Sequence, residues 1–341
     1  MTVVPPYLIE ALERHPSPRV RRAAERTRAT VIRHERLPVA PAERAAPRPH
    51  PRRRLVYDSE RTRALPGRLL RSEGERRCGD ADADRAYDMA GHTLEFYAAV
   101  FKRDSIDARG MHVISSVHFG ERYQNASWNG AQMIYGDGDG EVFNSFTSCL
   151  DVAAHELAHG IVQADAGILY EGESGALCES IADVFGSLVK QWVLRQTVAE
   201  ADWVVGAGIY RPGINGVGLR SLAAPGSAYD DPVLGGRDPQ PSHMRDFVES
   251  GAGTNVVHLN SGIPNHAFYR FARALGGSAW RTAGHVWYAA VRSGLRRDCG
   301  FRAFATATVE AAGSHGNHAV ESARVAWHDV GITVRASSCR S

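Results

Sequence analysis

The chain has 341 residues, 43% of them hydrophobic and 8% aromatic, and a formal net charge of +2, which is ordinary for a globular protein that buries a large core in more than one lobe. No apolar run is long enough for a membrane span, and five widely spread cysteines argue against a disulfide framework. Prolines and glutamates interrupt the first twenty residues, so we expect no secretory signal peptide and a protein that is cytoplasmic or exported by a non-classical route.

Charge is distributed unevenly along the chain. Residues 1–54 hold 13 arginines against 5 acidic residues, a balance of +8, whereas the remainder holds 27 basic against 33 acidic residues, a balance of −6. Opposite signs favour docking of the first segment onto the rest of the chain. A solvated basic arm is the plainer alternative, and a nucleic-acid-binding arm is a third. Nucleic acid is disfavoured because Tyr7 is the only aromatic residue of that segment, which leaves little to stack on bases.

Residues 1–51 are predicted to form a helical leader that ends in a processing linker. The residue pattern predicts one short amphipathic helix over residues 6–15 and a second helix over residues 19–36. The stretch LPVAPAERAAPRPHPRRR that follows is rich in proline and arginine, so we expect it to be extended and exposed. Cleavage near residues 50–54 would release the rest of the chain.

The remaining chain divides into two parts of different pattern. Residues 52–170 are predicted to form a β-rich lobe that ends in a helix over the stretch DVAAHELAHG. Within it, residues 55–140 alternate turn clusters with short β-rich runs such as MHVISSVHFG, apart from one helix candidate over residues 83–102. Helical patterns dominate residues 171–341. The sequence therefore predicts an α+β protein with a β-rich lobe, an α-helical lobe and a cleft between them, where a substrate is expected to bind.

The stretch DVAAHELAHG holds the first candidate site. His155 and His159 are four residues apart in a run of helix formers, so both side chains lie on one face and can hold one metal ion. Catalytic zinc usually has three protein ligands, and the stretch GALCESIADVFG offers Glu179 as the third. Asp183, one turn further on the same face, can orient a ligand histidine. The alternative is an ordinary helix with two solvated histidines.

Several further motifs accompany these two helices. In chain order they are YQNASWNGAQMIYGDGDG, AGILYEGESGA, IYRPGINGVGLRSL and VHLNSGIPNHAFY. Over roughly residues 52–332 their order and spacing resemble the thermolysin family of zinc metallopeptidases, and the start VPPYLIEAL is similar to the short propeptide of the protealysin-like group. The resemblance implies a two-lobed thermolysin-like fold, with the active-site cleft between the lobes, preceded by a short helical propeptide.

The resemblance also implies a role for each active-site residue. Glu156 would act as general base toward a metal-bound water and return the proton to the leaving amine. Tyr170 and His258 would donate hydrogen bonds to the oxyanion. Asp183 would orient a ligand histidine through the ring N–H that does not face the metal. The three zinc ligands would be His155, His159 and Glu179.

A substrate peptide would bind as an extended strand at the edge of the β-rich lobe. By resemblance, Asn125 and the backbone of Ala126 would supply main-chain hydrogen bonds, and Arg220 would contact a substrate carbonyl. The pocket for the side chain just after the scissile bond would be apolar, so we expect a bulky hydrophobic residue there and broad specificity. The pocket positions are Phe143, Phe146, Val152 and Leu219.

Two departures from the family pattern bear on activity. Gly253 stands where the family has an aspartate that orients the histidine matched by His258. Cys178 stands where the family commonly has an asparagine, and it removes an expected hydrogen bond to His159. Both changes are expected to weaken the site without dismantling it.

A third departure concerns calcium. At the family's double calcium site only Asp151 and Asp202 remain, and Lys190, Val204 and Ala207 stand at the other positions. A calcium ion needs six to eight oxygen ligands, so we expect none to bind there. We predict instead that the Lys190 ammonium pairs with Asp151 or Asp202.

Three functions are compatible with the sequence. The leading one is a zinc-dependent neutral endopeptidase made as a self-inhibited precursor, whose partners are peptide or protein substrates, its own propeptide and, as a further candidate, a proteinaceous inhibitor. The second is a weakened or inactive relative that acts as a binding module. The third is nucleic-acid binding through the arginine-rich start.

Overall fold

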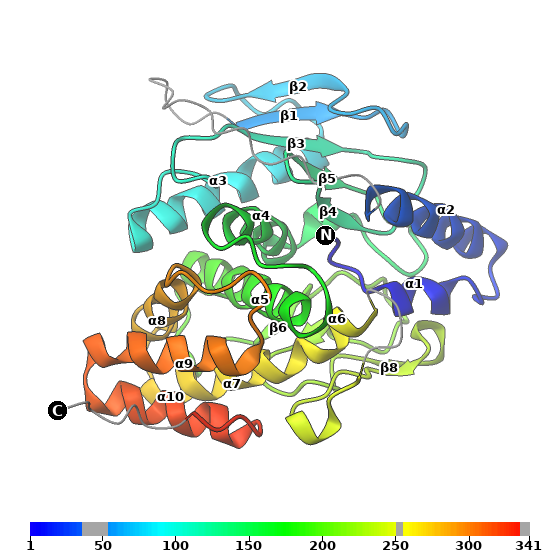
Figure 1. Ribbon diagram of the computed structural model, residues 1–341. Helices are drawn as coiled ribbons and strands as arrows, with labels where there is room; N and C mark the ends of the chain where they lie inside the picture. Colours follow the sequence, from blue (N-terminus) through cyan, green and yellow to red (C-terminus); the bar gives the residue numbers. More distant parts are fainter. Residues whose placement is uncertain (36–53, 250–254, 335–341) are drawn as a thin grey trace.

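The computed structural model describes residues 1–35, 54–249 and 255–334. Gly253 and most of the expected cleavage region, residues 50–53, lie outside the described residues. A mixed β-sheet forms one end of the molecule, a group of helices forms the other, and two helices lie between them (Figure 1). The two-lobed α+β fold predicted from the sequence is confirmed.

The N-terminal lobe is built on a five-stranded sheet with the strand order β2-β1-β3-β5-β4. The three central strands are parallel, while β2 and β4 pair antiparallel at the two edges. One edge of β4 therefore has no partner within this sheet, and its backbone groups are available for another strand. The strands are β1 (Arg54–Asp58), β2 (Arg68–Ser72), β3 (Val113–Val117), β4 (Ala126–Trp128) and β5 (Met133–Tyr135).

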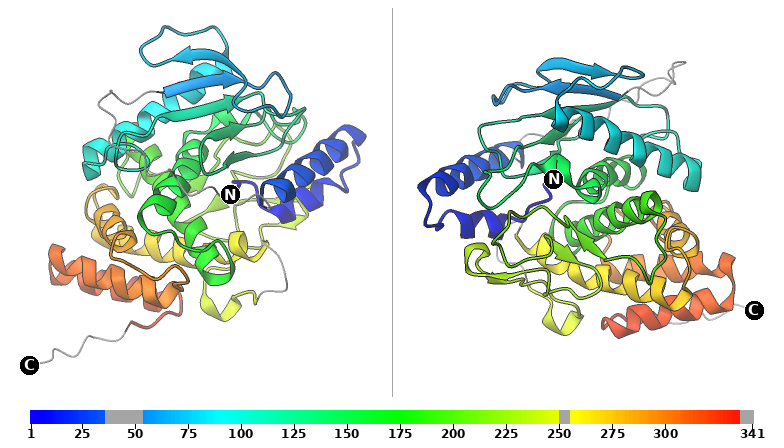
Figure 2. Two further views of the ribbon diagram at one scale, coloured as in Figure 1. Left: turned by 45° about the horizontal axis from the view of Figure 1, so that its top comes forward. Right: turned by 180° about the vertical axis from the view of Figure 1, so that it is seen from behind.

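Helix α3 (Ala81–Phe101) packs against this sheet, as the views in Figures 1 and 2 show. It begins at Asp80, whose side chain accepts a hydrogen bond from the backbone N–H of Ala83, as expected of an N-terminal cap. It ends at Lys102, which adopts a left-handed φ of 56°. The sequence predicted this helix over residues 83–102, within two residues of the observed bounds.

Helices α4 (Leu150–Asp165) and α5 (Gly172–Leu194) form the centre of the molecule. Both are buried around most of their circumference, as expected of helices that are packed from several sides. They approach closely at Gly186, where an added Cβ would lie 2.6 Å from the backbone oxygen of Asp151. This close approach brings the side chains of one helix within reach of the other.

The C-terminal lobe packs its helices around stacked aromatic rings. The rings of Trp287 and Trp327 are nearly parallel, with centroids 5.7 Å apart, and Phe268 and Phe271 pack against Trp287. The helices are α6 (Asn255–Asn260), α7 (Gly262–Leu275), α8 (Thr282–Val291), α9 (Phe301–Ala312) and α10 (Asn317–Asp329). The short elements elsewhere are β6 (Val204–Val205), β7 (Arg220–Ser221), β8 (Asp230–Asp231), β9 (Gly236–Arg237), η1 (Phe146–Ser148), η2 (Pro232–Leu234), η3 (Met244–Asp246) and η4 (Gly313–His315).

The leader forms two helices, α1 (Pro6–Leu12) and α2 (Pro18–Glu35), that lie against both lobes (Figures 1 and 2). Leu8, Ile9 and Leu12 of α1 are buried. On α2, the hydroxyl of Thr27 accepts a hydrogen bond from the backbone N–H of Gln124, 3.0 Å away. The leader is therefore docked on the rest of the chain, which is the arrangement that the opposite charges favoured over a free arm.

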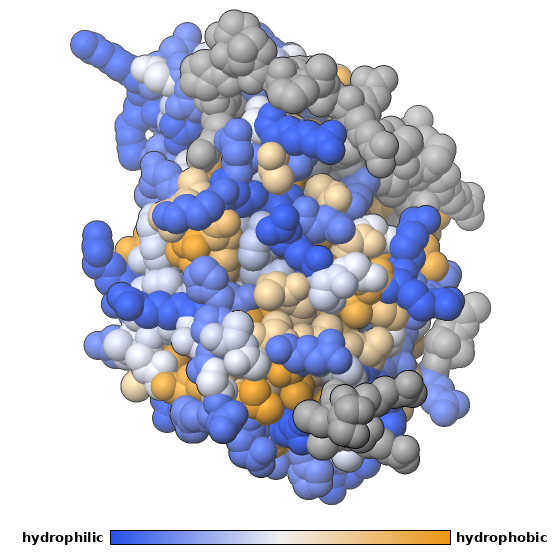
Figure 3. Space-filling model, turned by 60° about the vertical axis from the view of Figure 1, so that its left-hand side comes forward, coloured by the Kyte–Doolittle hydropathy of each residue, from blue (hydrophilic) through white to orange (hydrophobic). Residues whose placement is uncertain are grey.

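On the face shown in Figure 3, hydrophilic residues are interspersed with smaller groups of hydrophobic ones. Within the described ranges, no helix combines the length and the apolar character that crossing a bilayer requires.

Candidate active site

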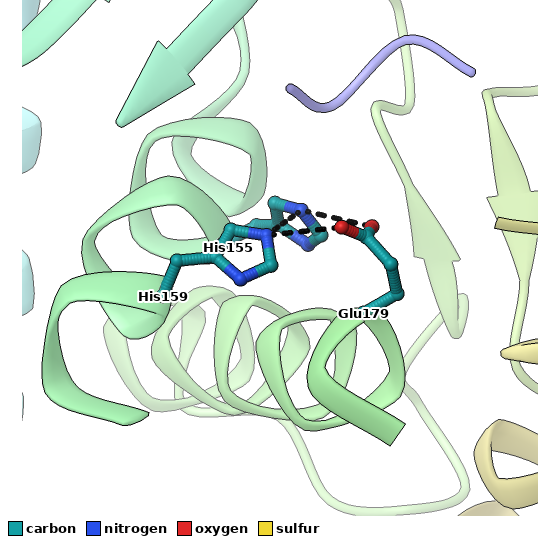
Figure 4. Close-up of side chains that lie close together, drawn as sticks. All are labelled: His155, His159 and Glu179. Carbon is teal, nitrogen blue, oxygen red and sulfur yellow. Dashed lines mark hydrogen bonds and ion pairs between the residues drawn. The ribbon is translucent and has the colours of Figure 1, made fainter. Parts of the chain in front are cut away.

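Three side chains from the central helices converge on one point. His155 and His159 project from α4, and Glu179 projects from α5 toward them (Figure 4). The two Nε2 atoms are 3.1 Å apart, and the Glu179 carboxylate oxygens lie 3.5 Å from His155 Nε2 and 3.3 Å from His159 Nε2. All three residues are at most 1% exposed.

The spacing of these atoms fits a zinc ion. Tetrahedral zinc with nitrogen and oxygen ligands at about 2.0–2.1 Å holds its ligand atoms about 3.3–3.4 Å apart. The three observed separations of 3.1, 3.3 and 3.5 Å bracket that value. Two imidazoles and one carboxylate are also a ligand set that zinc accepts, so this cluster can hold a metal ion.

Asp183 connects the cluster to Arg220. Its Oδ1 lies 2.8 Å from His155 Nδ1, on the ring edge that faces away from Glu179. Its two oxygens also accept hydrogen bonds from Nη2 and Nε of Arg220 at 2.7 and 2.8 Å. Burial raises the pKa of the Asp183 carboxyl, but Arg220 and His155 outweigh that effect and hold the pKa below its usual range. Asp183 therefore stays ionised and fixes the orientation of His155.

His159 lacks comparable support on its second nitrogen. Within the described residues, His159 Nδ1 has no hydrogen-bond partner. Cys178 stands beside Glu179 on α5, and its Sγ contacts the backbone oxygen of Ile168 at 3.8 Å. Burial lowers the pKa of His159 to about 4, so the ring is neutral at ordinary pH and can bind a metal ion.

Glu156 lies beside the cluster and is completely buried. Its Oε2 accepts a hydrogen bond of 2.7 Å from the backbone N–H of Trp128 on β4. Its Oε1 has no hydrogen-bond partner among the described residues, although the atom is buried. Burial raises the pKa of Glu156 to about 7. A buried carboxyl with one unused oxygen and a pKa near neutrality has the properties of a general base.

Tyr170 and His258 reach the cluster from its other side. The Tyr170 hydroxyl donates a hydrogen bond to Glu179 Oε1, and His258 Nε2 lies 3.4 Å from Glu179 Oε2. Within the described residues His258 Nδ1 has no hydrogen-bond partner. Gly253, which replaces the aspartate that orients this histidine in the family pattern, lies outside the described residues. Both side chains thus border the cluster that could hold a metal ion.

The start of the chain pairs with the free edge of β4. Thr2 forms an antiparallel bridge with β4, and the N–H of Val3 donates to the backbone oxygen of Ala126 at 3.2 Å. The N–H of Val4 donates to Asn125 Oδ1 at 2.9 Å, and Asn125 Nδ2 donates to the Val4 carbonyl at 3.3 Å. The residues predicted to bind a substrate backbone thus bind the leader.

The same segment is held from the opposite side. Arg220 Nη1 donates to the carbonyl oxygen of Val3 at 2.7 Å, and His258 Nε2 lies 2.9 Å from the carbonyl oxygen of Thr2. In Figure 4 a pale blue segment from the start of the chain runs above the Glu179 side chain in this view. Thr2, Val3 and Val4 were not identified from the sequence, although two valines before a proline pair are typical of a short strand. No sequence pattern indicated that the backbone N–H of Trp128 would bind Glu156, because a backbone contact does not depend on the type of side chain.

The four predicted pocket positions are all buried. Each of them is 0% exposed with the leader in place. The rings of Phe143 and Phe146 lie 5.5 Å apart, and Leu219 directly precedes Arg220. The four positions are Phe143, Phe146, Val152 and Leu219.

At the position of the family's double calcium site the structure has an ion-pair cluster. Lys190 Nζ lies 2.9 Å from Asp151 Oδ2 and 2.9 Å from Asp202 Oδ1, as predicted. The same ammonium donates to the backbone oxygen of Val204. A cation of the protein itself therefore satisfies the two remaining carboxylates.

A second group of potential metal ligands lies at the start of α3. Asp80, Asp82 and His118 bring one ligand atom each within 4.8 Å of one another. His118 Nδ1 lies 2.7 Å from Asp137 and its Nε2 lies 3.0 Å from Asp80, so both ring nitrogens already have acidic partners. This group is an internal ion-pair network in the structure.

Comparison with known proteins agrees with this geometry. Residues 56–163 match the family profile described as thermolysin metallopeptidase, catalytic domain, and residues 166–332 match the profile of its alpha-helical domain. The chain belongs to the thermolysin family of metallopeptidases. It is therefore an enzyme of a zinc-dependent family, and its buried histidine and glutamate cluster lies within the two matched regions.

Individual thermolysin-family relatives match over most of the chain. An extracellular metalloprotease of Pectobacterium carotovorum subsp. carotovorum is 45% identical over 347 residues, which cover 98% of this chain and 97% of the relative. A thermolysin of Alicyclobacillus acidocaldarius subsp. acidocaldarius is 36% identical over 247 residues, which cover 72% of this chain and 41% of the relative. The solved precursor of protealysin, a metalloproteinase from Serratia proteamaculans, has a TM-score of 0.89 at 44% identity and covers 98% of this chain and 100% of that chain.

Proposed function

We propose that this thermolysin-family protein is a zinc-dependent neutral endopeptidase made as a self-inhibited precursor, with residues 1–51 as its propeptide. The observation that carries the proposal is the buried group of His155, His159 and Glu179 with the unused Glu156 oxygen beside it. The preferred substrate has a bulky hydrophobic side chain just after the scissile bond. Calcium has no part in the proposal, because Lys190 supplies the positive charge at the position where it would bind.

The proposed reaction is addition of water to a peptide carbonyl. A bound zinc ion would supply a Lewis acid and a water of lowered pKa at the open ligand position. Glu156 takes a proton from the attacking water and returns it to the amine nitrogen as the peptide bond breaks. His258 and Tyr170 donate hydrogen bonds to the developing oxyanion. Arg220 and β4 hold the substrate backbone in an extended conformation.

Self-inhibition is supported by the contacts of the leader. Its first residues use Asn125, Ala126, Arg220 and His258, and a substrate would need the same groups. Helix α1 anchors that segment, because three of its apolar side chains are buried. A substrate can therefore enter only after the leader has moved away.

The preference for hydrophobic side chains is supported by the four apolar pocket positions. An apolar pocket gains roughly 1–3 kcal/mol per added methylene, so related side chains are separated only modestly. We expect peptides with leucine or phenylalanine after the scissile bond to be cut at least about tenfold faster than peptides with aspartate there. Steady-state rates on a matched set of fluorogenic peptides measure this preference.

The rival function, a binding module with little activity, is motivated by the unsupported His159 and by the Gly253 and Cys178 substitutions. A fluorogenic peptide assay on zinc-loaded protein, before and after cleavage in the linker, separates the two functions. We expect turnover that appears after linker cleavage and disappears with a zinc chelator. If the processed protein retains zinc but shows no turnover, the binding module is correct.

The role of Glu156 is tested with Glu156→Gln. We expect the variant to bind zinc as tightly as the wild type does and to lose activity by roughly 100- to 10,000-fold. Glu200→Gln, at an exposed surface glutamate, is the matched control and should keep full activity. Zinc content by mass spectrometry and peptide turnover are measured on the same samples.

A further inference from the structure

We propose that the leader is itself a substrate, bound in the productive direction and register, with the Thr2–Val3 peptide bond at the reaction centre. Hydrolysis there leaves Val3 as a new N-terminus. The inference rests on the proposed function and adds to it the bond that the enzyme cuts in its own leader.

The position of one carbonyl identifies the bond. The Thr2 carbonyl oxygen lies 2.9 Å from His258 Nε2, and the same nitrogen lies 3.4 Å from Glu179 of the metal cluster. The Val3 and Val4 carbonyls bind further away, at Arg220 and at Asn125. Of these three carbonyls, that of Thr2 therefore lies where an oxyanion would develop.

The general base Glu156 on α4 contacts the same stretch of β4 that the leader pairs with. Thr2 bridges to Ser127, and the next residue, Trp128, donates its N–H to Glu156. The second oxygen of Glu156 has no partner among the described residues. A water that binds to this oxygen would approach the carbonyl carbon of Thr2.

Val3 is placed as the residue just after the scissile bond. Its N–H donates to Ala126 and its carbonyl accepts from Arg220, so its backbone is fixed on both sides. Its side chain is 0% exposed and apolar, as the pocket predicted for that position requires. Leu219, one of the pocket residues, directly precedes Arg220 in the chain.

The proposed step balances without any further reactant. Water adds to the carbonyl carbon of Thr2 and gives one proton to Glu156. The bond between that carbon and the Val3 nitrogen then breaks, and its electron pair stays on the nitrogen, which takes up the proton. This gives a carboxylic acid on Thr2 and an amine on Val3. The second proton of the water then passes from the acid to the amine, so the products are a carboxylate on Thr2 and an ammonium on Val3.

Proline prevents the leader from moving forward by one residue. If the chain moved forward by one residue, the Val3–Val4 bond would reach the centre and Pro5 would lie opposite Asn125 Oδ1. Pro5 has no N–H to donate there, so the hydrogen bond that Val4 makes at 2.9 Å would be lost. Helix α1, with Leu8 and Leu12 buried, also resists such a shift. The cut leader is therefore expected to stay in the cleft as a bound product.

The test starts from metal-free full-length protein, to which zinc is added while intact mass and N-terminal sequence are followed. We expect Val3 to appear as an N-terminus in most molecules, at a fractional rate that does not depend on protein concentration. Val3→Leu should be cut at least as fast as the wild type, and Val3→Lys at least roughly tenfold more slowly. Val217→Lys places the same charge at a position that is 60% exposed and should cut like the wild type.

A second measurement reports the register without catalysis. In the full-length Glu156→Gln protein, the Val3 and Val4 amides should be protected from hydrogen exchange, and Val3→Lys in that background should reduce the protection at least roughly tenfold. If the processed enzyme cuts peptides but residues 1–2 remain attached, the inference is wrong and the proposed function stands. If there is neither peptide turnover nor cutting at Val3, the proposed function fails as well.

Discussion

At the scale of single residues, Asp183 joins the metal-ligand cluster to Arg220. One carboxylate contacts the ring of His155, forms two hydrogen bonds with Arg220 and accepts a third, of 2.9 Å, from Asn265 Nδ2. It is 0% exposed, so all of these interactions lie in a medium of low dielectric constant. Asp183 thus couples the orientation of a metal ligand to the residue that holds the leader.

We therefore expect Asp183→Asn to weaken zinc binding by about 10- to 100-fold, because an amide supports the His155 ring less well than a carboxylate does. The change also leaves the buried Arg220 charge without its partner, so the free energy of unfolding should fall by about 3–5 kcal/mol. Competition with a chromogenic chelator and urea unfolding measure the two effects. Asp230→Asn, at an exposed aspartate, is the control, and equal zinc affinity in both variants would contradict the role of Asp183.

Lys190 is the second residue with a large expected effect. Lys190→Met would leave Asp151, which is 1% exposed, without its cation, and should lower the free energy of unfolding by about 3–5 kcal/mol. Because the lysine already neutralises this site, millimolar calcium should leave the melting temperature of the wild type unchanged. A strong rise with calcium but not with magnesium would show that the assignment is wrong.

At the scale of elements, His118 ties the start of α3 to the sheet. It follows β3 and lies between Asp137, which follows β5, and Asp80, the N-cap of α3. The hydrogen bond with Asp137, together with Asp80, raises the pKa of His118 to about 9. The imidazolium therefore joins the two elements throughout the neutral pH range.

The pH dependence of this link has a definite sign. The pKa of His118 is about 9 in the folded protein, against an ordinary value of 6.5. The charge of His118 therefore stabilises the fold fully below pH 6.5 and loses that effect as the pH rises through 9. We expect His118→Asn, chosen because asparagine tolerates the left-handed φ of 53°, to lower the melting temperature by about 2–4 °C at pH 6. The difference from the wild type should shrink toward pH 10, as measured by circular dichroism. An equal difference at both pH values would exclude the charged link.

The sequence predicted elements and contacts that depend on local spacing. The shared face of His155 and His159 followed from their spacing of one helical turn, and Glu179 was predicted as the third ligand from the second helical motif. The Lys190 pair followed from the loss of acidic neighbours. The pairing of Thr2 with β4 could not be predicted, because the two segments are about 125 residues apart and a short strand shows no periodicity. The same holds for His118 and Asp80, whose contact depends on how α3 crosses the sheet.

At the scale of the whole molecule, apolar burial rather than charge holds the leader. Leu8, Ile9 and Leu12 are each at most 2% exposed, and fully burying such a side chain contributes about 1.5–3 kcal/mol. The Arg26–Glu121 ion pair joins side chains that are 49% and 60% exposed, and exposed pairs of this kind contribute little. The opposite charges of the two segments are therefore expected to guide docking more than to maintain it.

Peptide turnover by the uncleaved chain distinguishes the contribution of apolar burial from that of charge to the binding of the leader. Leu8→Asp should release the leader and raise peptide turnover at least roughly tenfold, because a carboxylate cannot remain in that apolar site at low cost. Arg26→Ala, or an increase in salt to about 1 M, should change turnover by less than about twofold. Activation by salt alone would mean that charge holds the leader in place.

The edge of β4 that the leader covers also matters before the protein meets a substrate. While residues 2–4 lie there, they cover the backbone N–H and C=O groups of this edge strand. Newly made identical chains at high concentration are thereby protected from pairing edge to edge. If the leader leaves, the edge of β4 that would bind a substrate peptide can also pair with a second copy of the chain. If residues 1–51 are removed as proposed, the enzyme would gain access for its substrates and lose this protection against edge-to-edge association.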